Sequence, residues 1–360
     1  MPVEETAASQ GGFAWRGLSL DVVRHFFTVE DVIRVMDIAQ SVGLNRMHLH
    51  LSDDQGWRLD IPGWPELVER SSGSGVGGGP GGFYSRADWD RLKDAAGRRG
   101  LVLIPEIDLP GHSNAALHAV PGLNPDGATP PEYHGIEVGF SSLRLAAPDT
   151  QRFIRDVYAH LVDISEGLVH IGGDESHATD AAEYGELLDM IVAAVHDAGG
   201  TVIAWQEAAA HLHEGDYVQV WDPRLATAPV VAAAKRGVKV ILSPASRVDL
   251  DMKYAESHDL GLTWMGTTEL DRTARLDPAA LIEGLDPAAI AGIEAALWTE
   301  TLATFEEVSY MLLPRLAAVG EIAGTGRLDW ESFADRLPAM AEVWRERGWP
   351  WHRSPGIAWR

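Results

Sequence analysis

The sequence contains no cysteine. Structural disulfides, thiolate zinc sites, iron–sulfur clusters and a cysteine nucleophile are therefore excluded. Basic residues are also scarce, because 29 lysines and arginines stand against 53 acidic residues and give a formal net charge of -24. A surface of this charge repels phosphate groups, so we expect neither a nucleic acid nor an anionic membrane as a partner.

Long apolar runs are absent as well. No run approaches the roughly 18 apolar residues of a membrane span, and residues 1–12 lack the basic and apolar segments of a signal peptide. We therefore expect a cytoplasmic protein, or a secreted one if a leader was removed. No glycine-rich dinucleotide fingerprint follows a strand, and the glycine-rich stretch 71–82 lacks the Lys-Ser/Thr of a phosphate-binding loop. We interpret that stretch as a mobile loop, with substrate gating as the lesser alternative.

Short apolar runs alternate with longer amphipathic segments through most of the chain. Strands are expected at 18–22, 46–51, 101–105, 168–171, 201–205, 217–221, 238–242 and 290–297. Helices are expected at 29–42, 86–99, 149–164, 181–198, 225–236 and 304–323. This alternation favours an α/β fold with a single closed (β/α)8 barrel, and an open doubly wound sheet is the alternative.

The chain is accordingly divided into three parts. Residues 1–15 are expected to form an N-terminal extension, and residues 16–326 the barrel. Residues 327–360 are expected to form a C-terminal helix and a Trp/Pro tail packed on that barrel. The sequence does not define the oligomeric state.

Carboxylates and tryptophans follow many of the expected strands. In a barrel the active site lies at the carboxyl ends of the strands, and there the sequence has Asp53, Asp174-Glu175, Trp205, Trp221 and Trp298-Thr299-Glu300. Carboxylates accept hydrogen bonds from hydroxyl groups, while indoles form apolar walls. The combination suits a neutral polyhydroxylated ligand.

The adjacent pair Asp174-Glu175 is the most informative feature of this group. Two glycines precede it, so the backbone and a ligand can approach each other closely. Neighbouring carboxyls beside apolar walls titrate at different pH values, so one can be ionised while the other holds a proton. Glycoside hydrolysis needs this division of labour. The alternative is an ordinary acidic loop after a strand.

A metal-dependent hydrolase is a rival interpretation. It starts from His48 and His50 at the end of an early strand, with His112, His170 and Asp174 as further ligands. This reading leaves the tryptophans unexplained. We therefore favour a structural role for His48 and His50 beneath the site, and expect no metal and no cofactor.

These residues resemble the catalytic barrel of the family 20 glycoside hydrolases, the β-N-acetylhexosaminidases. The matching stretches run in family order and are 16–21, 48–57, 105–112, 170–175, 205–207, 251–254, 261–264 and 297–300. The resemblance implies an exo-acting, retaining, substrate-assisted mechanism on terminal β-linked GlcNAc or GalNAc of an oligosaccharide. Glu175 would be the general acid and base. Asp174 would orient the 2-acetamido group and stabilise the charge formed as its oxygen attacks C1.

The resemblance also implies the substrate-binding residues. Trp205, Trp221 and Trp298 would surround the acetamido methyl group, and Trp264 would lie near the leaving group. Arg16 would hold O3 and O4, with Glu300 on O4 and O6 and Asp251 near O6. Asp53 and His112 would lie behind Glu175 and adjust its acidity.

Two departures from the family pattern bear on these expectations. Many relatives carry a separate small domain before the barrel, and Arg16 lies too near the start of this chain for one. The family usually has Tyr-Leu-Asp where this chain has Asp249-Leu250-Asp251. An ionised Asp249 accepts hydrogen bonds and cannot donate one, so it would repel the acetamido oxygen to which the family tyrosine donates. Three alternatives follow: Asp249 is protonated, it points away and another donor replaces it, or it recognises a different 2-substituent. A glycosidase of the same fold with altered specificity for the 2-substituent, and a non-catalytic sugar-binding barrel, are therefore alternatives.

Overall fold

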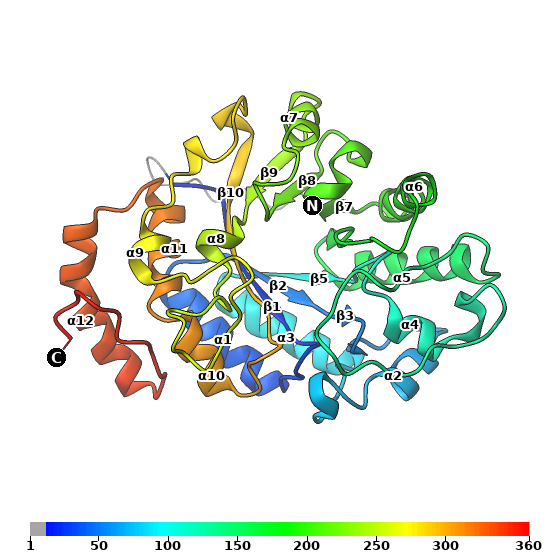
Figure 1. Cartoon of the computed structure of the whole chain (residues 1–360), viewed down its shortest axis with the longest axis horizontal. Helices are drawn as coiled ribbons and strands as arrows, with labels where there is room; N and C mark the ends of the chain where they lie inside the picture. The colour runs from blue at the N-terminus through cyan, green and yellow to red at the C-terminus, as the bar shows by residue number, and fades with distance from the viewer. Residues whose placement is uncertain (1–11, 360) are drawn as a thin grey trace.

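Eight parallel strands close into a barrel in the computed structural model, which describes residues 12–359 (Figure 1). In order around the barrel they are β1 (Trp15–Asp21), β10 (Ile290–Leu297), β9 (Lys239–Leu242), β8 (Tyr217–Val220), β7 (Thr201–Trp205), β6 (Leu168–His170), β5 (Val102–Glu106) and β2 (Arg46–His50). The ring closes where β1 pairs with β10, from Trp15 opposite Gly292 to Leu20 opposite Leu297. The closed barrel is thus confirmed, and the open sheet was the wrong alternative.

Helices surround the strands. They are α1 (Val29–Ser41), α2 (Glu66–Ser71), α3 (Arg86–Arg98), α4 (Asn114–Ala119), α5 (Thr150–Ile164), α6 (Ala181–Asp197), α7 (Ala228–Lys235), α8 (Ala245–Val248), α9 (Leu270–Ala274), α10 (Phe305–Leu312), α11 (Arg315–Thr325) and α12 (Trp330–Glu346). Short 3-10 helices lie at Val76–Gly78, Pro121–Leu123, Gln206–His211, Pro278–Ala280 and Pro287–Ala289. In the described part of the chain, no helix is long and apolar enough to cross a membrane.

Local sequence signals explain where several helices begin and end. Thr28, Ser85 and Thr304 each accept a hydrogen bond from the third residue of the following helix, whose acidic side chain binds back to the cap. The single helix expected at 304–323 is instead two helices, α10 and α11. Pro314 separates them, because proline has no N–H for the helical ladder and its ring clashes with the preceding turn.

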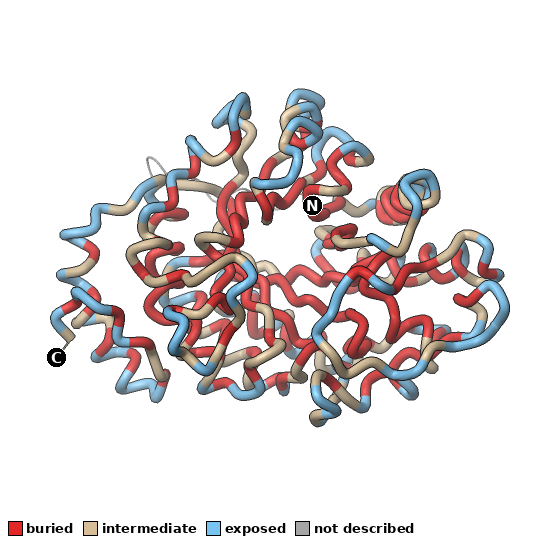
Figure 2. Tube along the Cα trace, in the orientation of Figure 1, coloured by how far each residue is buried: buried red, intermediate tan, exposed pale blue. Residues whose placement is uncertain are grey.

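The main hydrophobic core lies between the strands and the helices, and exposed residues gather on the outer helices and loops (Figure 2). A second, smaller cluster of Trp15, Ile104, Ile203 and Ile241 lies inside the barrel. Side chains alternate along a strand, so the next inward layer toward the carboxyl ends contains Glu106 and Trp205. The inside of the barrel therefore changes from apolar to polar toward the end that carries the site.

Two peripheral segments are held by specific contacts. Buried Arg58 donates hydrogen bonds to the backbone oxygens of Ser72, Ser74 and Gly82, so it holds the glycine-rich stretch at three points, and the mobility expected from the composition of that stretch stays a prediction. Beyond α12, the backbone N–H of His352 donates to the oxygen of Leu313, and its Nε2 lies 2.9 Å from Glu269 Oε2. Residues 1–11, most of the expected N-terminal extension, lie outside the described part of the chain.

Candidate active site

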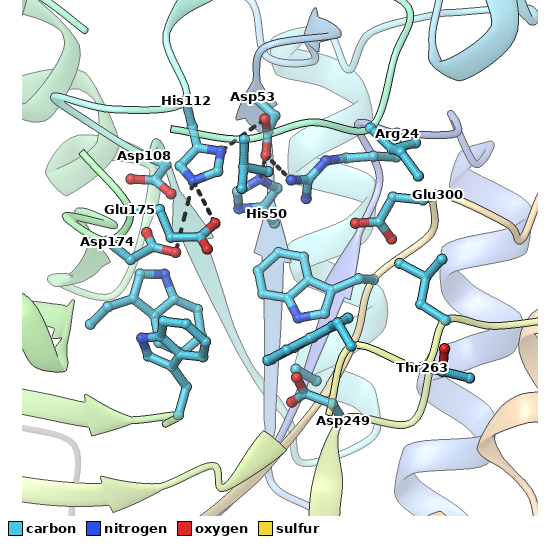
Figure 3. Close-up of a pocket in the computed structure, with 18 residues that line it drawn as sticks. Arg24, His50, Asp53, Asp108, His112, Asp174, Glu175, Asp249, Thr263 and Glu300 are labelled. Atoms are coloured by element: carbon cyan, nitrogen blue, oxygen red, sulfur yellow. Dashed lines mark hydrogen bonds and ion pairs between the residues drawn. The ribbon is translucent and has the colours of Figure 1, made fainter. Parts of the chain in front are cut away.

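A cavity of about 580 Å³ lies at the carboxyl ends of the barrel strands. Most of the residues predicted from the sequence line it together: Asp53, His112, Asp174, Glu175, Trp205, Trp221, Asp249, Trp264, Trp298 and Glu300. Figure 3 shows Asp174 and Glu175 on one side of the cavity, and Arg24 and Glu300 on the opposite side. The size fits a pocket that encloses a small ligand.

Two of the predicted residues do not line this cavity. Arg16 was a wrong choice, because it lies near the start of β1 and its guanidinium donates to the backbone oxygens of Gly43 and Phe13. The arginine of the cavity is Arg24, which follows the carboxyl end of the same strand. Asp251 is buried behind the wall, where its Oδ1 accepts the backbone N–H of Trp298 at 3.4 Å.

The backbone around the Asp174-Glu175 pair is unusual. Gly172 has a φ of 68°, and a side chain there would overlap the carboxylate of Asp108. Glu175 itself has a φ of 45°. A non-glycine residue held in the left-handed region is strained, and such strain gathers at functional sites. Gly172 therefore permits the close approach of Asp108, and the strained turn presents Glu175 to the cavity.

Asp174 and Asp108 form a coupled acidic pair. Burial and the charge of Asp108 raise the pKa of Asp174 well above its usual value. Burial also raises the pKa of Asp108 to about 7, and Glu106 adds to this effect. Two carboxyls in contact cannot both ionise easily, so the pair holds a proton near neutral pH. Oδ1 of Asp174 is buried without a hydrogen-bond partner, and Asp174 lines the cavity, so this carboxyl group has an unused acceptor beside the cavity.

A chain of charged groups connects Glu175 with the opposite side of the site. Glu175 Oε2 lies 3.5 Å from His112 Nε2, and His112 Nδ1 lies 3.1 Å from Asp53 Oδ1. Asp53 Oδ2 is 2.8 Å from a guanidinium nitrogen of Arg24. Burial alone would lower the pKa of His112, but Asp53 and Asp108 outweigh it and raise that pKa well above the usual value. A cationic His112 therefore faces Glu175 from behind.

Beneath this chain lies a buried layer of histidines and carboxylates. The two ring nitrogens of His48 face Glu294 at 2.9 Å and Glu106 at 3.1 Å. Those of His50 face Glu106 at 2.6 Å and Asp53 at 2.8 Å. Burial would lower both pKa values, but the facing carboxylates raise the pKa of His48 to about 9 and that of His50 to about 10.

This layer bears on the metal interpretation. His48, Glu106 and His170 lie close enough together to be considered as a ligand set. However, an imidazolium has no free lone pair for a metal, and Nδ1 of His48 is already hydrogen-bonded to Glu294 at 2.9 Å. The structural role expected for His48 and His50 fits these contacts.

Four indoles form much of the apolar wall. The rings of Trp205 and Trp298 lie 6.1 Å apart, and those of Trp221 and Trp264 lie 5.9 Å apart. Trp205 donates its indole N–H to Glu106 at 3.0 Å, and Trp221 donates to Glu207 at 3.1 Å. These bonds fix the ring orientations. Trp264 is 45% exposed and so stands at the mouth of the cavity.

Comparison with known proteins decides the family. The family model described as "Glycosyl hydrolase family 20, catalytic domain" matches residues 13–186 and 181–327. The β-N-acetylhexosaminidase of Cellulomonas fimi is 47% identical over 351 residues, which cover 96% of this chain and 71% of that protein. The chain belongs to glycoside hydrolase family 20. The β-hexosaminidase of Akkermansia muciniphila is 30% identical over 363 residues, which cover 90% of this chain and 71% of that protein.

Solved structures of family 20 agree with the fold. The β-N-acetylhexosaminidase of Streptomyces coelicolor A3(2) superposes with a TM-score of 0.94 at 41% identity, covering 97% of this chain and 72% of that one. The enzyme of Streptomyces plicatus, solved with Thio-NAglucal, gives a TM-score of 0.94 at 42% identity over the same shares.

Among the residues that line the cavity of this family 20 barrel, sequence reasoning did not single out Arg24, Asp108, Ile136 and Val138 as site residues. Arg24 and Asp108 both follow a strand, so the rule that sites form at carboxyl ends would have found them. Ile136 and Val138 belong to the long connection between β5 and β6, and no local pattern marks them. They are 48% and 37% exposed and add an apolar rim to the mouth.

Proposed function

We propose that the chain is an exo-acting, retaining β-N-acetylhexosaminidase that removes terminal β-linked GlcNAc or GalNAc by substrate-assisted catalysis. One observation carries this proposal: two adjacent carboxyls reach the same cavity from different environments. Asp174 is buried beside Asp108 with one oxygen free, while Glu175 is more exposed and lies against cationic His112. Membership of family 20 and the β-N-acetylhexosaminidases among the relatives support the same chemistry.

The first step divides the work between the two carboxyls. Oδ1 of Asp174 accepts the N–H of the 2-acetamido group and stabilises the positive charge that develops on it. The acetamido carbonyl oxygen attacks C1 and forms the C1–O bond of an oxazolinium ion. The bond from C1 to the leaving oxygen breaks with its electron pair, and that oxygen takes the proton of Glu175. The nucleophile belongs to the substrate, so the protein does not need one.

The second step reverses these roles. Glu175, now a carboxylate, takes a proton from water, and the water oxygen attacks C1. The C1–O bond to the acetamido oxygen breaks, which restores the acetamide and leaves the sugar with its original β configuration. The indoles of Trp205, Trp221 and Trp298 wall the cavity, so electrostatic interactions within it are weakly screened.

The two ends of the cavity fit an exo mode of attack. On the side away from Glu175, Arg24, which is paired with Asp53, offers donors to sugar hydroxyls, and Glu300 beside it in Figure 3 offers acceptors. At the mouth, Trp264 with Ile136 and Val138 supplies exposed apolar surface for the leaving group. A terminal sugar would thus be enclosed while its aglycone lies at the rim.

Hydrolysis of a chromogenic aryl β-GlcNAc, followed by absorbance and by proton NMR, tests the proposal. We expect turnover that EDTA does not diminish, with the β anomer of GlcNAc as the first product detected. Activity lost to EDTA would support the metal-dependent alternative instead. An α anomer as the first product would contradict the retaining mechanism.

A further inference from the structure

Asp249 is a buried acid that reaches the cavity from a third direction. It follows α8 and pairs in a single bridge with Ala296 of β10. The residue is only 2% exposed, yet it lines the cavity. Figure 3 shows it apart from both Asp174-Glu175 and Arg24-Glu300. The mechanism described above makes no use of this carboxyl group.

The surroundings of Asp249 are acidic. The carboxyl groups of Asp251 and Glu300 act on it most strongly, and Asp222 acts more weakly. The indole of Trp298 is its hydrogen-bonding neighbour. Asp251 is itself buried, and one of its oxygens has no partner. Three carboxyl groups from two loops therefore share one poorly solvated corner.

The basic groups near this corner are occupied elsewhere. Arg24 pairs with Asp53 and Asp21, and Arg224 pairs with Asp222. Arg315 uses its guanidinium to bind four backbone oxygens, among them those of Leu250 and Met252. Burial, followed by Asp251 and Glu300, raises the pKa of Asp249 well above its usual value. Such a carboxyl group keeps its proton to a higher pH than an ordinary aspartic acid, and in its protonated form it is a hydrogen-bond donor.

The proposed substrate contains an acceptor that fits such a donor. The N–H and the carbonyl of a trans amide point in opposite directions. If Asp174 accepts the acetamido N–H, the carbonyl oxygen is directed to another side of the cavity, where a donor would orient it. An ionised carboxylate there would repel the oxygen and favour a cationic amine.

We propose that Asp249 is a specificity-determining residue which, as a neutral carboxylic acid, donates a hydrogen bond to the carbonyl oxygen of the 2-acetamido group. The inference rests on the proposed function. In this proposal the acidic corner selects N-acetylated sugars, because its carboxyl groups keep Asp249 protonated in the working enzyme. The same corner, once ionised, would disfavour that substrate.

Two substitutions of Asp249 distinguish a hydrogen-bond donor from a side chain that only fills space. Asp249→Asn keeps the size and a donor but cannot ionise, whereas Asp249→Leu keeps a similar size without any donor. On aryl β-GlcNAc at pH 5 we expect Asn to retain kcat/KM within about threefold, and Leu to lose about tenfold or more, as for a missing buried hydrogen bond. Equal losses in Asn and Leu would overturn the proposal.

The pH dependence provides a readout that packing would not change. Ionisations common to both enzymes largely cancel in the ratio of kcat/KM for wild type to that for Asp249→Asn. Since Asp249 has a raised pKa, its proton is present at low pH and is lost as the pH rises. The ratio should therefore be near one at low pH and fall at high pH, and a flat ratio would overturn the proposal.

A variant of Asp251 tests why Asp249 keeps its proton. Asp251 does not line the cavity, and its charge contributes most among the neighbouring carboxyls to the raised pKa of Asp249. Asp251→Asn should therefore move the alkaline fall in aryl β-GlcNAc hydrolysis to lower pH. An alkaline fall that stays at the same pH or moves upward would contradict the role assigned to the acidic corner.

Binding of free sugars separates this inference from the proposed function. Inactivity of wild type on aryl β-GlcNAc would sink the proposed function, while binding of GlcNAc and glucosamine by calorimetry still reports on Asp249. We expect GlcNAc to bind wild type and Asp249→Asn similarly, and Asp249→Leu about tenfold more weakly. Tighter binding of glucosamine than of GlcNAc to wild type, lost in Asn, would show an ionised Asp249 and overturn the proposal.

Discussion

The charge of Asp174 should account for a large part of the rate, and Asp174→Asn isolates it. Asparagine has nearly the same shape, and its oxygen can still accept the acetamido N–H, so substrate binding should change little. In the proposed mechanism Asp174 is the ionised member of its pair with Asp108, so the substitution removes a negative charge from the place where the oxazolinium charge develops. It should therefore act on the transition state more than on the ground state.

The size of the effect follows from the burial of Asp174. Two full charges 4 Å apart interact by about 4 kcal/mol at an effective dielectric constant of about 20. The transition state carries part of the final charge, so about 2–4 kcal/mol of stabilisation should be lost, or roughly 30- to 1000-fold in kcat. KM should change by less than about threefold, because uniform binding is retained.

Steady-state kinetics on an aryl β-GlcNAc would measure both constants. Asp189→Asn is a matched control, because Asp189 is exposed on α6, the helix that follows the same strand. Melting curves of both variants would show that the fold is intact. A folded Asp174→Asn enzyme with kcat within about threefold of wild type would refute the assignment of charge stabilisation to Asp174.

Three further changes test other parts of the structure. Glu175→Gln should cut kcat heavily on substrates with poor leaving groups and much less on activated aryl glycosides, since protonation matters less there; equal losses on both would count against Glu175 as the acid. Asp108→Asn should move the acid limb of kcat/KM to lower pH, because Asp174 must be ionised and loses a neighbour that raises its pKa. An acid limb that stays at the same pH would show that Asp108 does not influence the pKa of Asp174. Arg58→Met should lower the free energy of unfolding by about 3 kcal/mol or more, because buried backbone oxygens lose a charged donor; urea unfolding measures this, and a loss below about 1 kcal/mol would show that water replaces the guanidinium.

The barrel could be predicted from sequence because its signals are local. Strand 201–205 and strand 290–297 were placed at their observed bounds, since each is a mostly apolar run between turn residues. The expected helix at 304–323 ignored Pro314, which divides it. The fastening of the glycine-rich stretch by Arg58 could not be predicted, because it depends on a buried residue elsewhere in the chain.

The site was predictable where residues directly follow a strand. Asp174, Glu175, Trp205 and Trp298 meet in one cavity because every parallel strand ends on the same side of the barrel. Arg16 failed by the same rule, since it lies at the other end of its strand. The sequence indicated different protonation states for the adjacent Asp174 and Glu175, but it could not show the acidic corner around Asp249, which forms from residues brought together only in the folded chain.

The most direct test of substrate-assisted catalysis is a series of aryl β-glucosaminides whose N-acetyl group carries zero, one, two or three fluorine atoms. The leaving group stays the same, while the carbonyl oxygen becomes a weaker nucleophile with each fluorine. If that oxygen attacks C1, kcat/KM should fall steeply and steadily along the series, and the 2-hydroxyl analogue should barely react. A kcat/KM that stays level along the series would contradict the account, because it would mean that another group attacks C1.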